Sequence, residues 1–264
     1  GNSKVMTKIK AVFFDVDGTL FSFKDHAEPQ STRQAVRKLR TAGIMPILAT
    51  GRPTYQFNGL DLEPFETFIT LNGQLCFSGD DVYRKVTVSP EDVRVIVERT
   101  QAGLHPTLFM EREKFYVFEH TDRVSAVEDL VGITFPSGDA SWALGSDIYQ
   151  FNIYQDPSLD QDILDCTSSV TITRWTDLFA DVFPKGGGKA AAIAQTLEYL
   201  GITPQETIAF GDGGNDLSMF ELVGTAVAMG NASDEVKAAA DVITDDVDHD
   251  GIYNACVRLG LIDA

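Results

Sequence analysis

The chain has 264 residues and carries 39 acidic against 21 basic side chains, which gives a formal net charge of −18. This charge argues against a nucleic-acid partner, which needs a basic surface to neutralise phosphates, and against attachment to anionic lipid. Apolar residues make up 44% of the sequence, too many for a disordered acidic chain. The length allows one large domain or two smaller ones.

We expect no membrane span and no secretory leader. No stretch of the sequence approaches the roughly 18 uninterrupted apolar residues of a spanning helix, and residues 1–10 lack an apolar leader region. The three cysteines, Cys76, Cys166 and Cys256, are scattered without CxxC spacing, so we expect buried thiols in a reducing compartment. These features predict a cytoplasmic protein with no membrane partner; the oligomeric state is left open.

The first third of the chain alternates strand and helix patterns. Ile9–Phe14 is a continuous apolar run, typical of a strand buried on both faces. Apolar residues at helical spacing predict a helix over Pro29–Ala42. Strand patterns return at Ile44–Ala49 and Thr67–Leu71, and Pro53 can open a short helix between them. This alternation predicts a parallel sheet wound with helices.

The middle of the chain has a different pattern. Ser89 to Asp92 form a capping box that predicts a helix to about Gln101. Further strands and one helix are predicted at Thr107–Met110, Phe115–Phe118, Ile148–Tyr154, Pro157–Cys166 (the helix) and Val170–Trp175. Paired strands with helices between them indicate an α+β unit. We therefore predict residues 84–181 as an inserted domain, and residues 1–83 and 182–264 as a discontinuous core.

The last third returns to alternating strands and helices. Strands are predicted at Thr207–Phe210, Ala226–Met229 and Val242–Thr244, and helices at Lys189–Leu200, Leu217–Val223, Ser233–Ala240 and Ile252–Leu259. The chain as a whole is thus predicted to be an α/β protein with a parallel sheet core.

Polar residues follow four of the predicted core elements. Asp15 and Asp17 come directly after the first strand, and such a spacing suits a nucleophile with a general acid, or a hard-cation site. Thr50, Gly51 and Arg52 close the second strand and offer a small anion cradle. Because parallel strands present their carboxyl ends at one edge, we expect these groups to meet.

Two further segments lie late in the chain. The glycine-rich stretch from Lys185 to Lys189 fails as a P-loop, because Phe183 and Ala190 replace the required glycine and hydroxyl residue. It leaves a lysine near a helix start, suited to neutralising a phosphate. The segment Gly211–Asp216 supplies Asp212, Asn215 and Asp216, whose oxygens suit Mg²⁺. A later acidic run (Asp246, Asp248, Asp250) lacks the glutamate that an EF-hand needs and is predicted as a surface turn.

The order and spacing of these four segments resemble the haloacid dehalogenase-like superfamily, in particular its Cof-type phosphatases of subfamily IIB. Asn72-Gly73 and Asp250-Gly251-Ile252 are also similar to this subfamily. The resemblance implies a Rossmann-like parallel sheet core, with an α+β cap domain inserted between the second and third motifs. It favours Lys189 over Lys185 as the third-motif lysine, since Lys189 begins the helix before the fourth-motif strand.

The resemblance also implies a role for each motif residue. Asp15 would attack phosphorus to form an aspartyl-phosphate, and Asp17 would act as general acid and then general base. Thr50, Gly51, Lys189 and Asn215 would bind the phosphoryl oxygens. Mg²⁺ would be held by Asp15, the Asp17 carbonyl and Asp212, with Asp216 nearby. Because dehalogenases of the superfamily lack the second acid, Asp17 favours phosphoryl transfer over carbon–halogen hydrolysis.

Three functions remain open at this point. The leading prediction is a Mg²⁺-dependent phosphatase acting on small phosphorylated metabolites, with sugar phosphates as the first class to test. A sugar phosphomutase of the same superfamily is the alternative, and a catalytically silent binding protein comes last, since no motif is damaged.

Overall fold

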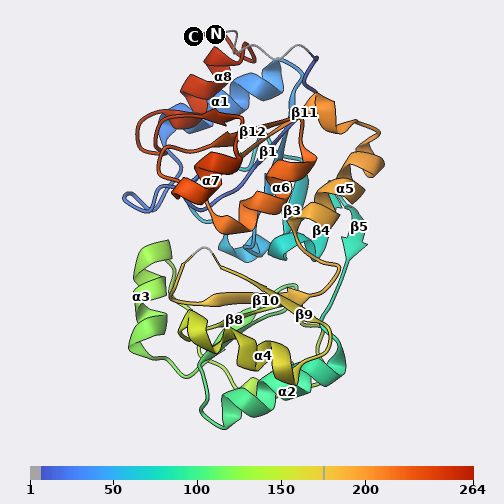
Figure 1. The fold of residues 1–264 in the computed structure, drawn as a ribbon, viewed down its shortest axis with the longest axis vertical. Helices are drawn as coiled ribbons and strands as arrows, with labels where there is room; N and C mark the ends of the chain where they lie inside the picture. The colour runs from blue at the N-terminus through green and yellow to red at the C-terminus, as the bar shows by residue number, and fades with distance from the viewer. Residues whose placement is uncertain (1–6, 175) are drawn as a thin grey trace.

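The computed structural model describes residues 7–174 and 176–264, and its strands form two sheets. The larger sheet has eight strands in the order β13-β12-β11-β1-β2-β3-β4-β5, and the smaller has five in the order β7-β6-β8-β10-β9. Figure 1 shows the two sheets one above the other, each with its own helices. The predicted α/β fold, with a parallel sheet core and an inserted α+β unit, is confirmed.

The larger sheet is parallel over most of its width. The parallel strands are β1 (Ala11–Phe14), β2 (Met45–Ala49), β3 (Thr67–Thr70), β11 (Thr207–Gly211), β12 (Thr225–Ala228) and β13 (Val242–Ile243). Two antiparallel strands, β4 (Leu75–Ser78) and β5 (Asp81–Lys85), extend one edge. β1 lies between β11 and β2, so the residues that follow it stand at the middle of the sheet's carboxyl edge.

Helices cover both faces of this sheet, which explains the continuous apolar run in β1. Val12 and Phe14 pack toward α1 (Gln30–Thr41) and α8 (Gly251–Arg258). The alternate residues of the strand, Ala11 and Phe13, pack toward the opposite face, covered by α5 (Lys189–Leu200), α6 (Leu217–Leu222) and α7 (Asp234–Ala239). Because successive strand side chains point to opposite faces, a strand between two helical layers must be apolar throughout.

The smaller sheet is antiparallel. Its strands are β6 (Thr107–Met110), β7 (Phe115–Phe118), β8 (Gln150–Ile153), β9 (Val170–Thr173) and β10 (Ala180–Pro184). One face packs on α2 (Pro90–Gln101) and α4 (Asp160–Cys166). On the other face, α3 (Asp122–Val131) shares an apolar cluster with Leu71 and Leu75. Leu75 begins β4 of the larger sheet, and Leu71 lies between β3 and β4. This second face is therefore turned toward the core (Figure 1).

The elements predicted for the core match those of the structure, and so does the helix capped by Ser89, whose hydroxyl accepts a hydrogen bond from the Asp92 amide. Three strands and one α-helix were not predicted from the sequence: β4, β5, β10 and α3. A charged residue, Asp181, lies inside β10 and interrupts its apolar pattern. The predicted strand at Val170–Trp175 ends at Thr173, and Trp175 lies outside the described residues.

The predicted boundaries at residues 84 and 181 fall inside β5 and β10. We propose that the inserted unit begins after β5 and ends with β10, so that each strand stays whole. Among the described residues, no helix is long and apolar enough to cross a bilayer. Cys76 and Cys256 are buried as expected, but the expectation was wrong for Cys166, which ends α4 on its exposed side.

Replacing Phe14 tests this packing. The side chain is fully buried and stacks on Phe210 with ring centroids 5.2 Å apart. Phe14→Ala should lower the free energy of unfolding by about 3–5 kcal/mol in urea titrations, because it leaves a cavity between the sheet and its helices. The control Leu104→Ala, at a side chain 57% exposed, should change it by less than about 0.5 kcal/mol. Equal losses in the two variants would contradict the assignment of this core.

Candidate functional site

The candidate site lies where β1, β2 and β11 end and α5 begins. β1 delivers Asp15 and Asp17, β2 delivers Thr50 and Gly51, β11 leads into Asp212, Asn215 and Asp216, and α5 starts with Lys189. Asp15, Asp17, Gly51 and Asn215 line one pocket, with Arg52 beside them. The structure therefore brings together the residues that the sequence placed at separate strand ends.

Lys189 is the centre of the charge cluster. Its ammonium lies 2.9 Å from Asp15 Oδ1 and 2.8 Å from Asp216 Oδ1, and all three side chains are buried. Burial alone would lower the pKa of Lys189, but the two carboxylates outweigh it and hold that pKa above its ordinary value. The competing candidate, Lys185, is exposed, and its ammonium lies 3.4 Å from the Ser168 carbonyl. Of these two lysines, Lys189 is the one in the site.

A third carboxylate, that of Asp212, lies close to the two that share the Lys189 ammonium. Oxygens of Asp15, Asp212 and Asp216 lie within 4.8 Å of one another. Burial, followed by the charge of Asp216, raises the pKa of Asp15 to about 7. Burial and the charge of Asp15 likewise raise the pKa of Asp212 well above its ordinary value. If all three carboxylates were ionised, one ammonium would leave two negative charges, and a divalent cation would balance them.

This donor set fits a divalent cation such as Mg²⁺, which prefers oxygen ligands. Asp212 Oδ1 accepts a hydrogen bond of 3.1 Å from the Thr19 hydroxyl. Asp216 is already engaged, because Oδ1 bonds Lys189 and Oδ2 accepts from the Asp212 and Gly213 amides. Asp15 and Asp212 are therefore the freest side-chain ligands, while the Asp17 side chain lies outside this cluster.

Gly18 is required because the segment after β1 closely approaches the segment after β11. Its φ is +79°, and a Cβ added there would lie 2.0 Å from Asp212 Oδ2. Any other residue would push the segment after β1 away from the one after β11. The glycine of the Asp-x-Asp-Gly pattern thus lets Asp15 and Asp212 meet.

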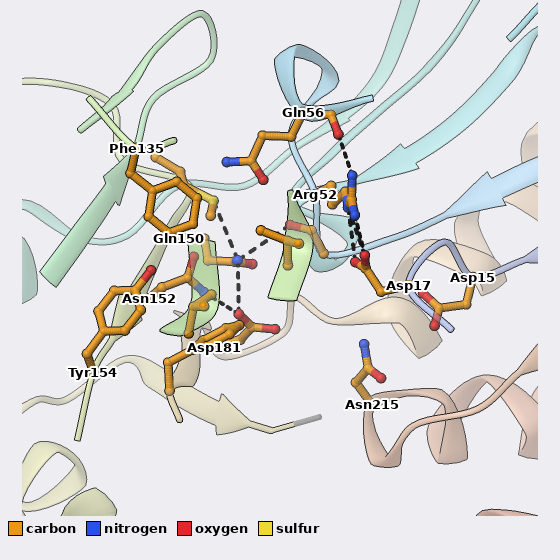
Figure 2. Close-up of a pocket in the computed structure, with 15 residues that line it drawn as sticks. Asp15, Asp17, Arg52, Gln56, Phe135, Gln150, Asn152, Tyr154, Asp181 and Asn215 are labelled. Carbon is orange, nitrogen blue, oxygen red and sulfur yellow. Dashed lines mark hydrogen bonds and ion pairs between the residues drawn. The ribbon is translucent and has the colours of Figure 1, made fainter. Parts of the chain in front are cut away.

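Asp17 is paired with Arg52 instead of Lys189. The guanidinium donates Nε to both carboxylate oxygens (3.1 and 3.0 Å) and Nη2 to Oδ1. Nη1 donates to the Gln56 carbonyl at 2.7 Å, and the guanidinium lies over the Phe21 ring at 4.5 Å. Figure 2 shows Asp17 and Asp15 side by side, with Arg52 holding only the first. Arg52, expected to belong to an anion cradle, is fixed here as the partner of the second carboxylate.

The remaining predicted residues surround the opening beside Asp15. The Thr50 hydroxyl accepts a hydrogen bond of 3.0 Å from the Arg52 amide and so shapes the loop that carries Gly51. Asn215 points its amide toward Asp15 and Asp17 (Figure 2). Within the described part of the chain, the buried Oδ1 of Asn215 has no hydrogen-bond partner. This unpaired oxygen can accept a hydrogen bond from a ligand, and the amide nitrogen can donate one.

The smaller sheet closes the pocket from above, with residues that the sequence analysis missed. Gln150, Asn152 and Asp181 face the site from β8 and β10, and an apolar group completes the wall: Met110, Val127, Val131, Phe135, Tyr154 and Phe179. The only sequence signal was that Gln150 and Asn152 alternate with the apolar Phe151 and Ile153 along β8.

Comparison with known proteins gives matches along nearly the whole chain. The model of the haloacid dehalogenase-like hydrolase family matches residues 12–256. One relative is YkrA of Bacillus subtilis (strain 168), which is named provisionally as a phosphatase. It is 35% identical over 257 residues, and the match covers 96% of this chain and 98% of that protein.

Two solved structures are similar over the same length. One is described as the HAD subclass IIB sugar phosphatase BT4131, with a TM-score of 0.89, 34% identity and coverage of 96% of this chain and 100% of the other. The second, BT1666 from Bacteroides thetaiotaomicron, is described among phosphatases of the haloalkanoate superfamily, with a TM-score of 0.87, 34% identity and coverage of 97% and 96%.

Adding Mg²⁺ to metal-free protein tests the cation site. We expect the melting temperature to rise by about 5 °C or more at saturation, because the ion binds only the folded state. Asp212→Asn should remove most of this rise and should not destabilise the metal-free protein, since it relieves repulsion. The matched control Asp246→Asn, in the exposed acidic turn, should keep the rise. Equal shifts in all three proteins would place the ion elsewhere.

A double-mutant cycle tests the Arg52–Asp17 pair. Removing Arg52 leaves a carboxylate without its buried partner, so Arg52→Met should cost about 3–5 kcal/mol in urea unfolding. Part of that loss should disappear in the Asp17→Asn background, giving a coupling of about 1–3 kcal/mol. Arg37→Met, which breaks an exposed pair with Asp61, should cost far less. Additive effects of the Arg52 and Asp17 substitutions would show that the pair does not stabilise the fold.

Proposed function

The chain belongs to the haloacid dehalogenase-like hydrolase family, and from this membership and the site we propose that it is a Mg²⁺-dependent phosphatase of small phosphorylated metabolites. The observation that carries the proposal is the buried Asp15 carboxylate, which shares the Lys189 ammonium with Asp216 and faces the pocket two residues before a second acid, Asp17. The similarity to a structure described as a sugar phosphatase supports sugar phosphates as the substrates to test first.

In the first step, an Asp15 oxygen attacks phosphorus and forms an aspartyl-phosphate. The bond between phosphorus and the leaving alcohol oxygen breaks, and that oxygen takes a proton from Asp17. In this structure Asp17 is held by Arg52. Proton donation by Asp17 therefore requires at least one of its hydrogen bonds with Arg52 to break when substrate binds.

In the second step, Asp17 accepts a proton from water while the water oxygen attacks phosphorus. The bond between phosphorus and Asp15 breaks, which restores the free carboxylate and releases inorganic phosphate. One pair of carboxylates thus serves both transfers, with the second acid reversing its role.

The phosphoryl oxygens would be bound by the Thr50 hydroxyl, the Gly51 amide, the Lys189 ammonium and the Asn215 amide. Their positions around Asp15 support this assignment, and the Asn215 amide nitrogen, a donor, is directed toward Asp15 and Asp17 (Figure 2). Mg²⁺, when held by Asp15, the Asp17 carbonyl and Asp212, with Asp216 behind them, would neutralise charge on the carboxylates and the phosphoryl group.

Phosphate release tests the nucleophile. Asp15→Asn should lower hydrolysis of p-nitrophenyl phosphate by about 10³-fold or more while the protein stays folded, because the amide cannot form the acyl phosphate. Asp92→Asn is the matched control: Asp92 is also a buried aspartate, but it caps the Ser168–Ser169 turn far from the pocket. Turnover by Asp15→Asn near that of the control would make the assigned nucleophile wrong.

The same preparation distinguishes the alternative function. A sugar phosphomutase would return the phosphoryl group to the sugar, so hexose phosphates would be isomerised with little free phosphate formed. A catalytically silent binding protein would release no phosphate from any ester.

A further inference from the structure

We propose that the part of the pocket beyond the phosphoryl site accepts an uncharged, polyhydroxylated leaving group, and that Asp181 excludes leaving groups carrying a second negative charge. This inference rests on the proposed function, because it assigns the alcohol half of the substrate. It identifies Asp181 and Gln56 as the residues that select the substrate.

Asp181 is a buried carboxylate that the proposed chemistry does not use. Its side chain is 3% exposed and accepts hydrogen bonds from three amides. Gln150 Nε2 (3.3 Å) and Asn152 Nδ2 donate to Oδ1, and Asn72 Nδ2 donates to Oδ2 at 3.2 Å. A carboxylate has about four acceptor positions. Oδ2 therefore keeps capacity for one more donor, such as a substrate hydroxyl.

Gln56 offers a donor on another side of the same space. The side chain is 7% exposed and lines the pocket, and Figure 2 shows its amide directed toward Phe135. Within the described residues, its buried Nε2 has no hydrogen-bond partner. A buried donor without a partner is costly, and a ligand hydroxyl would satisfy it.

Apolar and aromatic side chains line the same part of the pocket as these polar groups. Phe135, Tyr154 and Phe179 stand together with aliphatic side chains of Val127 and Val131. A sugar ring has hydroxyls at its edges and a face of C–H groups, so it matches a pocket lined by both hydrogen-bonding groups and aromatic rings. A purely apolar alcohol would leave Gln56 Nε2 without a hydrogen-bond partner.

The charges in this part of the pocket determine which leaving groups are excluded. Among the described residues that line it, Arg52 is the only cation, and its guanidinium is taken by Asp17. A second phosphate or a carboxylate on the leaving group would find no cation of its own and would face Asp181. Bisphosphates and phosphorylated acids should therefore be poor substrates, whereas neutral sugar monophosphates should be good ones.

Matched substrate pairs test this selection on the wild-type enzyme with Mg²⁺. Glucose 6-phosphate is compared with 6-phosphogluconate, and fructose 6-phosphate with fructose 1,6-bisphosphate, with p-nitrophenyl phosphate as the measure of chemistry. Burial raises the pKa of Asp181 to about 7, so the assays run near pH 8, where the carboxylate is ionised. We expect the neutral member to have a kcat/KM about 30-fold higher, the factor for two unit charges about 8 Å apart at an effective dielectric of about 20.

Two substitutions then assign the effect to residues. Asp181→Asn should bring the ratio within each pair close to one, because it removes the charge and keeps the size. Gln56→Leu should lower kcat/KM for glucose 6-phosphate relative to p-nitrophenyl phosphate by about 10-fold, since one hydroxyl loses its partner. The control Asp92→Asn, another buried carboxylate of the inserted unit, should leave every ratio at the wild-type value.

The outcomes separate this inference from the proposed function. Hydrolysis of p-nitrophenyl phosphate with equal kcat/KM within each pair would overturn the inference and leave the phosphatase in place. Wild-type ratios in Asp181→Asn would overturn the role of Asp181. No phosphate release from any ester, p-nitrophenyl phosphate included, would overturn the proposed function and the inference with it.

Discussion

The site depends on a concentration of buried negative charge. Three carboxylates lie within 4.8 Å of one another around one ammonium, that of Lys189. Two unit charges 4 Å apart repel by about 4 kcal/mol at an effective dielectric of about 20, so the fold must hold these groups together against a substantial cost. It does so with three rigid strand ends and with Gly18, which allows the loops to touch. In the proposed function, a divalent cation would offset this charge and allow a phosphate ester to bind.

The two sheets supply different groups to the pocket. The parallel sheet fixes the charged groups at its carboxyl edge, where the geometry tolerates little variation. The smaller sheet supplies neutral amides, rings and one carboxylate, Asp181, which lie over the pocket and contact the core through Asn72. The chain's net charge of −18 opposes an anionic substrate at long range, but salt screens that repulsion beyond about 8 Å. Capture therefore depends on the local cations at the sheet edge.

The sequence predicted the core well because its evidence was local. Asp15, Asp17 and Asp212 each follow a short apolar strand, and the choice of Lys189 over Lys185 agrees with the geometry. The family resemblance was confirmed by the comparisons. The part of the pocket beyond the phosphoryl site was not predictable in this way, because Gln56, Gln150 and Asp181 come from segments far apart in the chain. Only the tertiary fold brings them together, and a single aspartate inside an apolar strand gives no sign of what it faces.

The proposed mechanism requires Asp15 to carry the phosphoryl group during turnover. The most direct test is to mix Asp17→Asn protein with substrate and Mg²⁺, quench with acid, reduce with borohydride and map the peptides by mass spectrometry. With p-nitrophenyl phosphate as substrate, the leaving group needs no proton, so the Asp17→Asn protein should still form the acyl phosphate but lack the base that activates water. The acyl phosphate should therefore accumulate, and its reduction should convert Asp15 to homoserine only when substrate was present. Modification of a different residue, or phosphate release with Asp15 unchanged at every time point, would contradict the account.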